Sequence, residues 1–93
     1  MASWAKAKDP DAVLDYFFDW SEWLQDGELI ETSTYIVAGS ATLELFDETI
    51  DGGHTKFWAR GGDAGDVAKV TNRVSTNQGR VDDDTATLRI KSR

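Results

Sequence analysis

Residues 12–20, AVLDYFFDW, alternate between large apolar side chains and a second set that contains two carboxylates. One parity consists of Leu14, Tyr16, Phe18 and Trp20, and the other consists of Val13, Asp15, Phe17 and Asp19. A repeat of two is that of a β-strand, because the apolar face of a helix recurs every 3.6 positions instead. The stretch therefore predicts a strand with one strongly buried face.

Turn residues recur at short intervals after this stretch. Glycine-containing turns separate segments rich in β-branched and aromatic residues. The further strands that we expect are 29–37, 41–46, 54–59, 66–76 and 83–91. Six to seven short strands with this spacing are typical of a small antiparallel β-sandwich. We therefore expect an all-β domain over residues 12–93.

Residues 1–11 have a different character from the rest of the chain. They are mostly small or charged and end near the only proline, Pro10, which lacks an amide donor and restricts the residue before it to extended geometry. This composition predicts a flexible N-terminal arm that leads into the first strand.

The composition excludes several classes of protein. The formal net charge is −7, which disfavours nucleic acid and anionic membranes as partners, since both require a concentrated basic surface. The chain has no cysteine, so disulfides and thiolate zinc sites are excluded. The first residues lack the apolar segment of a secretory signal, and we expect the protein to be made in the cytoplasm.

No motif in the sequence specifies a reaction, a metal or a cofactor. His54 is the only histidine, and no nucleophile-elbow pattern occurs, so we expect no catalytic residue. One alternative is left open, a calcium- or carbohydrate-binding β-sandwich used in host attachment. The acidic clusters at Asp82–Asp84 and around Asp47, Glu48 and Asp51 would supply calcium ligands, and exposed tryptophans would stack on sugars. Asn72 falls on an apolar parity, and a buried amide there is expected to tie a neighbouring loop or strand.

The chain has more aromatic residues than a small core holds: four Trp, four Phe and two Tyr. We expect Tyr16, Phe18, Trp20, Tyr35 and one of Phe57 and Trp58 to fill the core. The remaining rings are candidates for a protein interface, because exposed aromatic side chains are favoured there. These candidates are Trp4, Phe17, Trp23 and Trp58. For Trp23 alone, an alternative is that it closes the end of the sandwich.

Several segments resemble a family of small virion proteins of tailed bacteriophages, the fibre–tail adaptors. The matching segments are KDPDAVLDY (8–16), DWS (19–21), TSTY (32–35) and GGDAGDVAKVTNRVSTNQGRVDD (61–83). The resemblance implies an Ig-like β-sandwich without catalytic residues. It also implies a structural role in the virion, joining tail, baseplate or neck components to a fibre or a neighbouring virion protein, in multiple copies.

Overall fold

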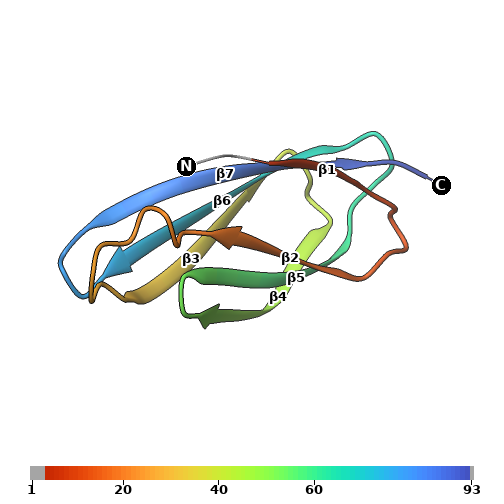
Figure 1. The fold of residues 1–93 in the computed structure, drawn as a ribbon. Coiled ribbons are helices and arrows are strands. Elements are labelled where there is room, and N and C mark those ends of the chain that lie inside the picture. The colour runs from red at the N-terminus through yellow and green to blue at the C-terminus, as the bar shows by residue number, and fades with distance from the viewer. Residues whose placement is uncertain (1–3, 93) are drawn as a thin grey trace.

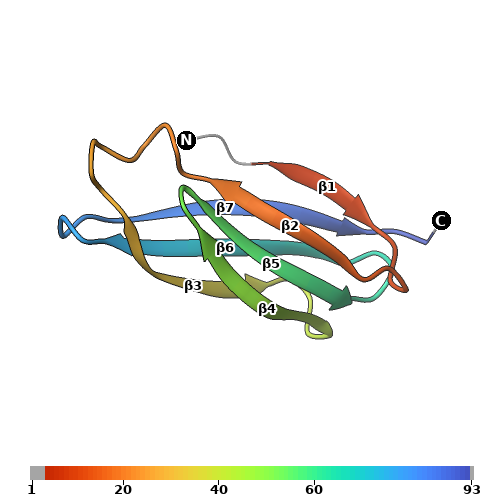
Figure 2. The ribbon, with the colours of Figure 1, turned by 60° about the horizontal axis from the view of Figure 1, so that its bottom comes forward.

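The computed structural model describes residues 4–92, which form seven strands and no helix. In chain order the strands are β1 (Ala5–Lys8), β2 (Leu14–Asp19), β3 (Ile30–Ala38), β4 (Leu43–Asp51), β5 (His54–Gly61), β6 (Val67–Thr76) and β7 (Val81–Ile90). One sheet has the order β1-β7-β6-β3, and the other has the order β2-β5-β4. The sheets lie one over the other (Figure 1, Figure 2), so the expected all-β sandwich is confirmed.

Strand alternation decides which side chains enter the core between the sheets. On the expected parity of β2, Tyr16, Phe18 and the following Trp20 are buried, but Leu14 at the start of the strand is exposed, which corrects the expectation for that residue. β5, β6 and β7 contribute further apolar residues. The aromatic residues at or below 5% exposure are Tyr16, Phe18, Trp20 and Phe57. Phe57 rather than Trp58 is the inward member of its pair, because it lies opposite Tyr16 in the β2–β5 ladder. Tyr35 is only partly buried against this core.

The expected N-terminal arm contains a strand, and this corrects the sequence-based picture for residues 5–8. β1 pairs in parallel with β7, so one pair in the sandwich is parallel where an antiparallel arrangement was expected. Lys8 is buried, and its Nζ donates to the carbonyl oxygens of Gly61 at 2.7 Å and Asp9 at 2.9 Å. The strand was missed because its residues are alanines and lysines, which carry little strand signal. Residues 1–3 of the expected arm lie outside the described residues.

Asn72 joins the two sheets at the centre of the sandwich. Its Oδ1 accepts hydrogen bonds from Trp20 Nε1 at 3.0 Å and from Thr55 Oγ1 at 2.6 Å. Its Nδ2 donates to Ser33 Oγ at 2.9 Å and to the carbonyl oxygen of Thr34 at 3.0 Å. The amide thus links β3 to β5 and to the end of β2, as expected for a buried amide whose polar atoms must be paired.

An ion pair between the buried Glu28 and the partly exposed Arg80 fixes the segment between β2 and β3. The side chain of Glu28 accepts hydrogen bonds from Thr76 Oγ1 at 2.6 Å and from Arg80 Nε at 2.8 Å. Arg80 also donates to the Trp23 carbonyl oxygen, and its guanidinium lies 4.1 Å from the centre of the Trp23 ring. Trp23 in turn packs edge-on against Trp20 at 5.3 Å. These contacts close one end of the sandwich over the β6–β7 hairpin.

The Glu28–Arg80 pair makes the stability of the fold depend on pH in the acid range. The hydrogen bond from Arg80 lowers the pKa of Glu28 from 4.5 to about 2. A carboxylate whose pKa is lowered by folding stabilises the folded state at pH values above its pKa in the unfolded chain. This contribution to the free energy of unfolding is lost as the pH falls from about 4.5 towards 2. We expect Glu28→Gln to lower the unfolding temperature at neutral pH and to flatten its decrease over that acid range. Calorimetry of both proteins across the range measures this, and parallel curves would contradict it.

Candidate protein-interaction face

The solvent side of the three-stranded sheet gathers the outward side chains of β2, β5 and β4. We define this outer face by nine residues: Asp15, Phe17, Asp19, Glu44, Phe46, His54, Lys56, Trp58 and Arg60. Their positions follow from strand alternation, since each of them is next in sequence to a residue that points into the core. The registers β2–β5 and β4–β5 then bring the three rows side by side.

Aromatic rings are the main apolar component of the outer face. Phe17 is 52% exposed, and its ring meets the His54 imidazole edge-on at 5.4 Å between centroids. Trp58 and Phe46 pack against each other at 6.3 Å, and the guanidinium of Arg60 lies 4.4 Å from the centre of the Phe46 ring. The rings are therefore held in place by neighbours on adjacent strands.

Ion pairs connect the strands between these rings. Lys56 Nζ lies 3.1 Å from Asp15 Oδ2, and its hydrogen bond lowers the pKa of that carboxyl. Arg60 pairs with Glu44. Beside these two ion pairs, the His54 imidazole is in polar contact with Asp19, at 3.6 Å from Nε2 to Oδ1. All these side chains are about half exposed, so each pair contributes little to stability in water. Their main effect is to hold a mixed surface of charges and rings.

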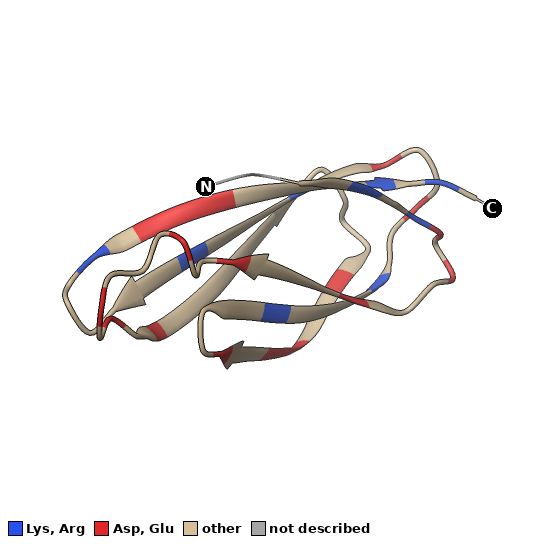
Figure 3. Cartoon of the chain, viewed as in Figure 1, with Lys and Arg blue, Asp and Glu red and all other residues tan. Residues whose placement is uncertain are grey.

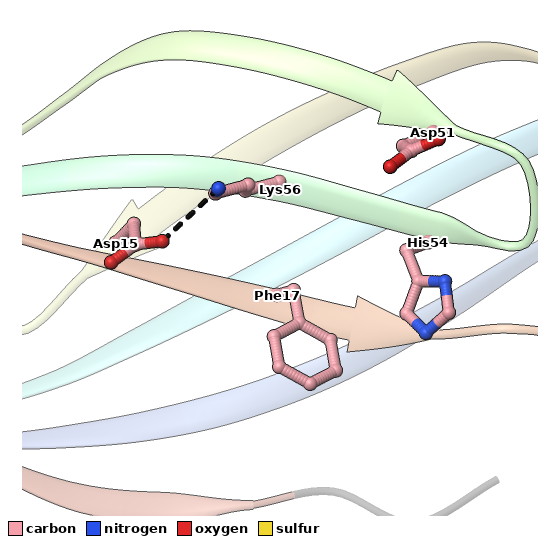
Figure 4. A pocket seen from close by; sticks show the side chains of 5 residues that line it. All are labelled: Asp15, Phe17, Asp51, His54 and Lys56. Atoms are coloured by element: carbon pink, nitrogen blue, oxygen red, sulfur yellow. Dashed lines mark ion pairs between the residues drawn. The ribbon is translucent and has the colours of Figure 1, made fainter.

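An open pocket of about 420 Å³ lies on this face. Its lining is Asp15, Phe17, Asp51, His54 and Lys56 (Figure 4). The side chains come from β2, β5 and the end of β4, and the Asp15–Lys56 pair crosses between the first two strands. The pocket thus offers a ring, an imidazole and carboxylates to a contacting surface, a mixture suited to polar and apolar contacts with another protein.

The four interface candidates lie in two different settings. Phe17 and Trp58 lie on the outer face. Trp4 packs against the core, stacked on Tyr16 at 5.5 Å and close to Phe57 at 6.4 Å, and Trp23 packs against Trp20 and Arg80. Sequence reasoning missed Phe46 and His54 as members of the face. For Phe46 the signal was present, since Leu43 and Leu45 point inward and Phe46 falls on the other parity.

The acidic cluster in β7 forms contacts within the fold, whereas Asp47, Glu48 and Asp51 of β4 are exposed. Asp83 forms a two-point contact with Arg73, at 2.7 and 3.0 Å, and the hydrogen bond lowers the pKa of the Asp83 carboxyl. Asp82 and Asp84 lie on the opposite parity of β7. Across residues 4–92, no three His, Asp or Glu side chains are grouped so that they could hold a metal ion. The same residues contain no helix long and apolar enough to cross a membrane.

One comparison with known proteins gives a match over most of the chain. The model of a protein family described as "Podophage GP4 fiber-tail adaptor protein gp77" matches residues 8–89. The matched region covers β2 to β6 entirely and nearly all of β7, whereas β1 contributes only Lys8. No curated protein matches the chain.

Proposed function

We propose, from the premise that this chain belongs to the podophage GP4 fibre–tail adaptor family, that it joins a fibre to the tail of a podophage particle. Membership of this family makes the protein a structural adaptor of a phage particle. The finer proposal is that it acts by non-covalent contacts with other virion proteins, without catalysis, after synthesis in the host cytoplasm. Several copies are proposed in each particle.

The outer face is the surface that we assign to one of these contacts. The observation that carries this assignment is the half-exposed Phe17 ring beside the Phe46–Trp58 pair, surrounded by ion pairs. Buried aromatic anchors within a charged and polar rim are the usual composition of protein interfaces. We therefore propose Phe17 and Trp58 as contact residues, while the packing of Trp4 and Trp23 supports a role for those two rings within the domain.

Deletion of the gene from the phage tests the adaptor function. We expect particles that contain DNA and a tail but lack fibres, and therefore adsorb poorly to cells. Electron microscopy and quantitative mass spectrometry of purified particles measure the loss, and supplying the wild-type protein in trans is expected to restore the fibres. Particles that keep a full set of fibres after the deletion would overturn the proposal.

Substitution of Phe17 tests the role of the outer face. Because this ring is half exposed, Phe17→Ser is expected to change the free energy of unfolding by no more than about 0.5 kcal/mol. If the ring is a central contact, its loss weakens partner binding by about 2 kcal/mol or more, roughly thirtyfold. The measurement is the amount of variant protein in purified particles, relative to a tail protein.

Leu29→Ser is the matched control for that experiment. Leu29 is 60% exposed but lies in the segment before β3, away from the outer face. The substitution removes an exposed apolar side chain, as Phe17→Ser does, and is expected to leave the amount of protein in the particles unchanged. Equal incorporation of the Phe17 and Leu29 variants would remove the outer face from the proposal without touching the adaptor function.

A further inference from the structure

Three of the four sheet edges carry features that oppose pairing with another strand. β1 is four residues long and contains two lysines. β2 places Asp15 and Asp19 within six residues. β4 has an irregular register between Phe46 and Thr49, with Asp47 at a φ of 49°. Short length, charge and bulges are the usual means by which proteins protect sheet edges.

The fourth edge, β3, has almost none of these features. It is nine residues long, contains no proline, and has Glu31 as its only charged residue. Its irregularity is confined to the start, between Ile30 and Thr32, and the register with β6 is continuous from Thr32 to Ala38. Within residues 4–92, β3 pairs with β6 alone, so its other side presents unpaired backbone groups. Ile36, on this strand, is 64% exposed.

The neighbouring strand in the other sheet supplies negative charge along the same side of the sandwich. β3 leads directly into β4, and both views place the two strands at one side of the molecule (Figure 1, Figure 2). β4 carries four acidic residues and no basic one: Glu44, Asp47, Glu48 and Asp51. Figure 3 shows red segments along this strand and no blue one. Glu44 is paired with Arg60. The charge of Glu48 reaches Tyr35 on β3, where it adds to the effect of burial in raising the pKa of the phenol.

We propose that the β3 edge receives an added strand from a partner protein, and that this strand is an extended segment rich in Lys or Arg. Backbone hydrogen bonds to β3 would give the affinity, and basic side chains facing the second layer would meet the carboxylates of β4. The inference rests on the proposed function only where it assigns the segment to another virion protein.

A second copy of this chain is a poorer occupant of the edge. Two antiparallel β3 strands related by a two-fold axis would place both three-stranded sheets on the same side of the joined sheet. The two acidic β4 strands would then approach each other, and each chain already carries a net charge of −7. Like charges brought together in this way oppose association. The charge pattern therefore favours a basic partner.

A synthetic peptide of about eight residues, alternating lysine and valine, is the probe for this edge. We expect its addition to the isotopically labelled protein to shift the amide signals of β3 and β4 and to slow hydrogen exchange in β3. A glutamate–valine peptide of the same length is expected to bind at least about tenfold more weakly. Binding of the lysine peptide is expected to weaken with added salt, since screening reduces the attraction.

One modified peptide and two protein variants separate strand addition from general attraction to an acidic protein. The lysine peptide with alternate backbone amides methylated keeps its charge but loses donors, and it is expected not to protect β3. The variant Asp47→Asn/Glu48→Gln is expected to bind the lysine peptide several-fold more weakly. The variant Asp11→Asn/Glu22→Gln removes the same charge at exposed sites outside β3 and β4 and is expected to bind like the wild type.

Three results would overturn the inference. They are the absence of lysine-peptide binding at about 1 mM, signal shifts confined to surfaces other than β3 and β4, and a β3–β3 dimer of the wild-type protein detected by sedimentation. Each of these leaves the gene-deletion test of the adaptor function unaffected, so the two proposals fail separately.

Discussion

Trp20→Ala is expected to destabilise the protein by about 3–5 kcal/mol, which is the usual cost of removing a fully buried large aromatic side chain. Trp20 is 0% exposed and packs against Trp23 at 5.3 Å between ring centroids. Its loss leaves a cavity and removes the Nε1 donor shared by Thr55 and Asn72. A domain of this size has a total stability of about 5–15 kcal/mol, so the variant is expected to be close to unfolding at 37 °C. Denaturant titration followed by circular dichroism measures the loss.

Two further variants test whether the loss at Trp20 comes from its burial. Trp20→Phe keeps most of the apolar volume but lacks the donor, so it is expected to cost less than the alanine variant. Trp58→Ala removes a partly exposed tryptophan from the outer face and is expected to cost about 1 kcal/mol, the average for a point substitution. If Trp20→Ala cost no more than Trp58→Ala, Trp20 would not be the central core residue that the structure makes it.

Gly39→Ala is expected to cost about 3 kcal/mol or more, because the position opposes a side chain in two ways. Gly39 has a φ of 86°, a left-handed conformation that costs other residues about 1–2 kcal/mol. A Cβ at this position would also lie 2.1 Å from the carbonyl oxygen of Val67, which belongs to the backbone of β6 and cannot rotate away. The turn connects β3 to β4, so relief of the overlap would shift one sheet relative to the other.

Gly79→Ala is the matched control for that prediction. Gly79 has a φ of 78°, but a Cβ there would meet no atom within 4 Å. It is expected to cost only the backbone penalty of about 1–2 kcal/mol. The two alanine variants, compared by denaturant titration, separate backbone strain from steric overlap. Equal losses would show that the contact with Val67 relaxes without cost.

The elements that the sequence predicted are those in which apolar and polar residues alternate within the element itself. The parity of Tyr16, Phe18 and Trp20 placed β2 and its buried face, and Asn72 was recognisable because it interrupts an apolar parity. The sequence did not predict which of Phe57 and Trp58 is buried. The two residues are adjacent and both large and aromatic, so either of them could point into the core. Only the register with β2 decides which one is buried.

The features that the sequence did not predict depend on distant parts of the chain. Glu28 meets Arg80 across 52 positions, and nothing near either residue in the sequence indicates the pair. β1 is a strand because β7 offers it a parallel edge and because the Trp4 ring enters the aromatic cluster. The sequence indicated only that some aromatic rings lie outside the core. Their arrangement on the outer face follows from the pairing of β2, β5 and β4, which are not all consecutive in the chain.

The parallel ladder between β1 and β7 also sets an order of events during synthesis. Ala5 pairs with Thr87, so β1 finds its neighbour only after β7 has been translated. Until β1 has paired with β7, the Trp4 ring is not held against Tyr16 and Phe18. Contacts between such remote positions form slowly because a long loop must close first. A nascent chain stalled before Thr87 therefore exposes aromatic side chains that β1 later covers, and such a surface is a target for chaperones.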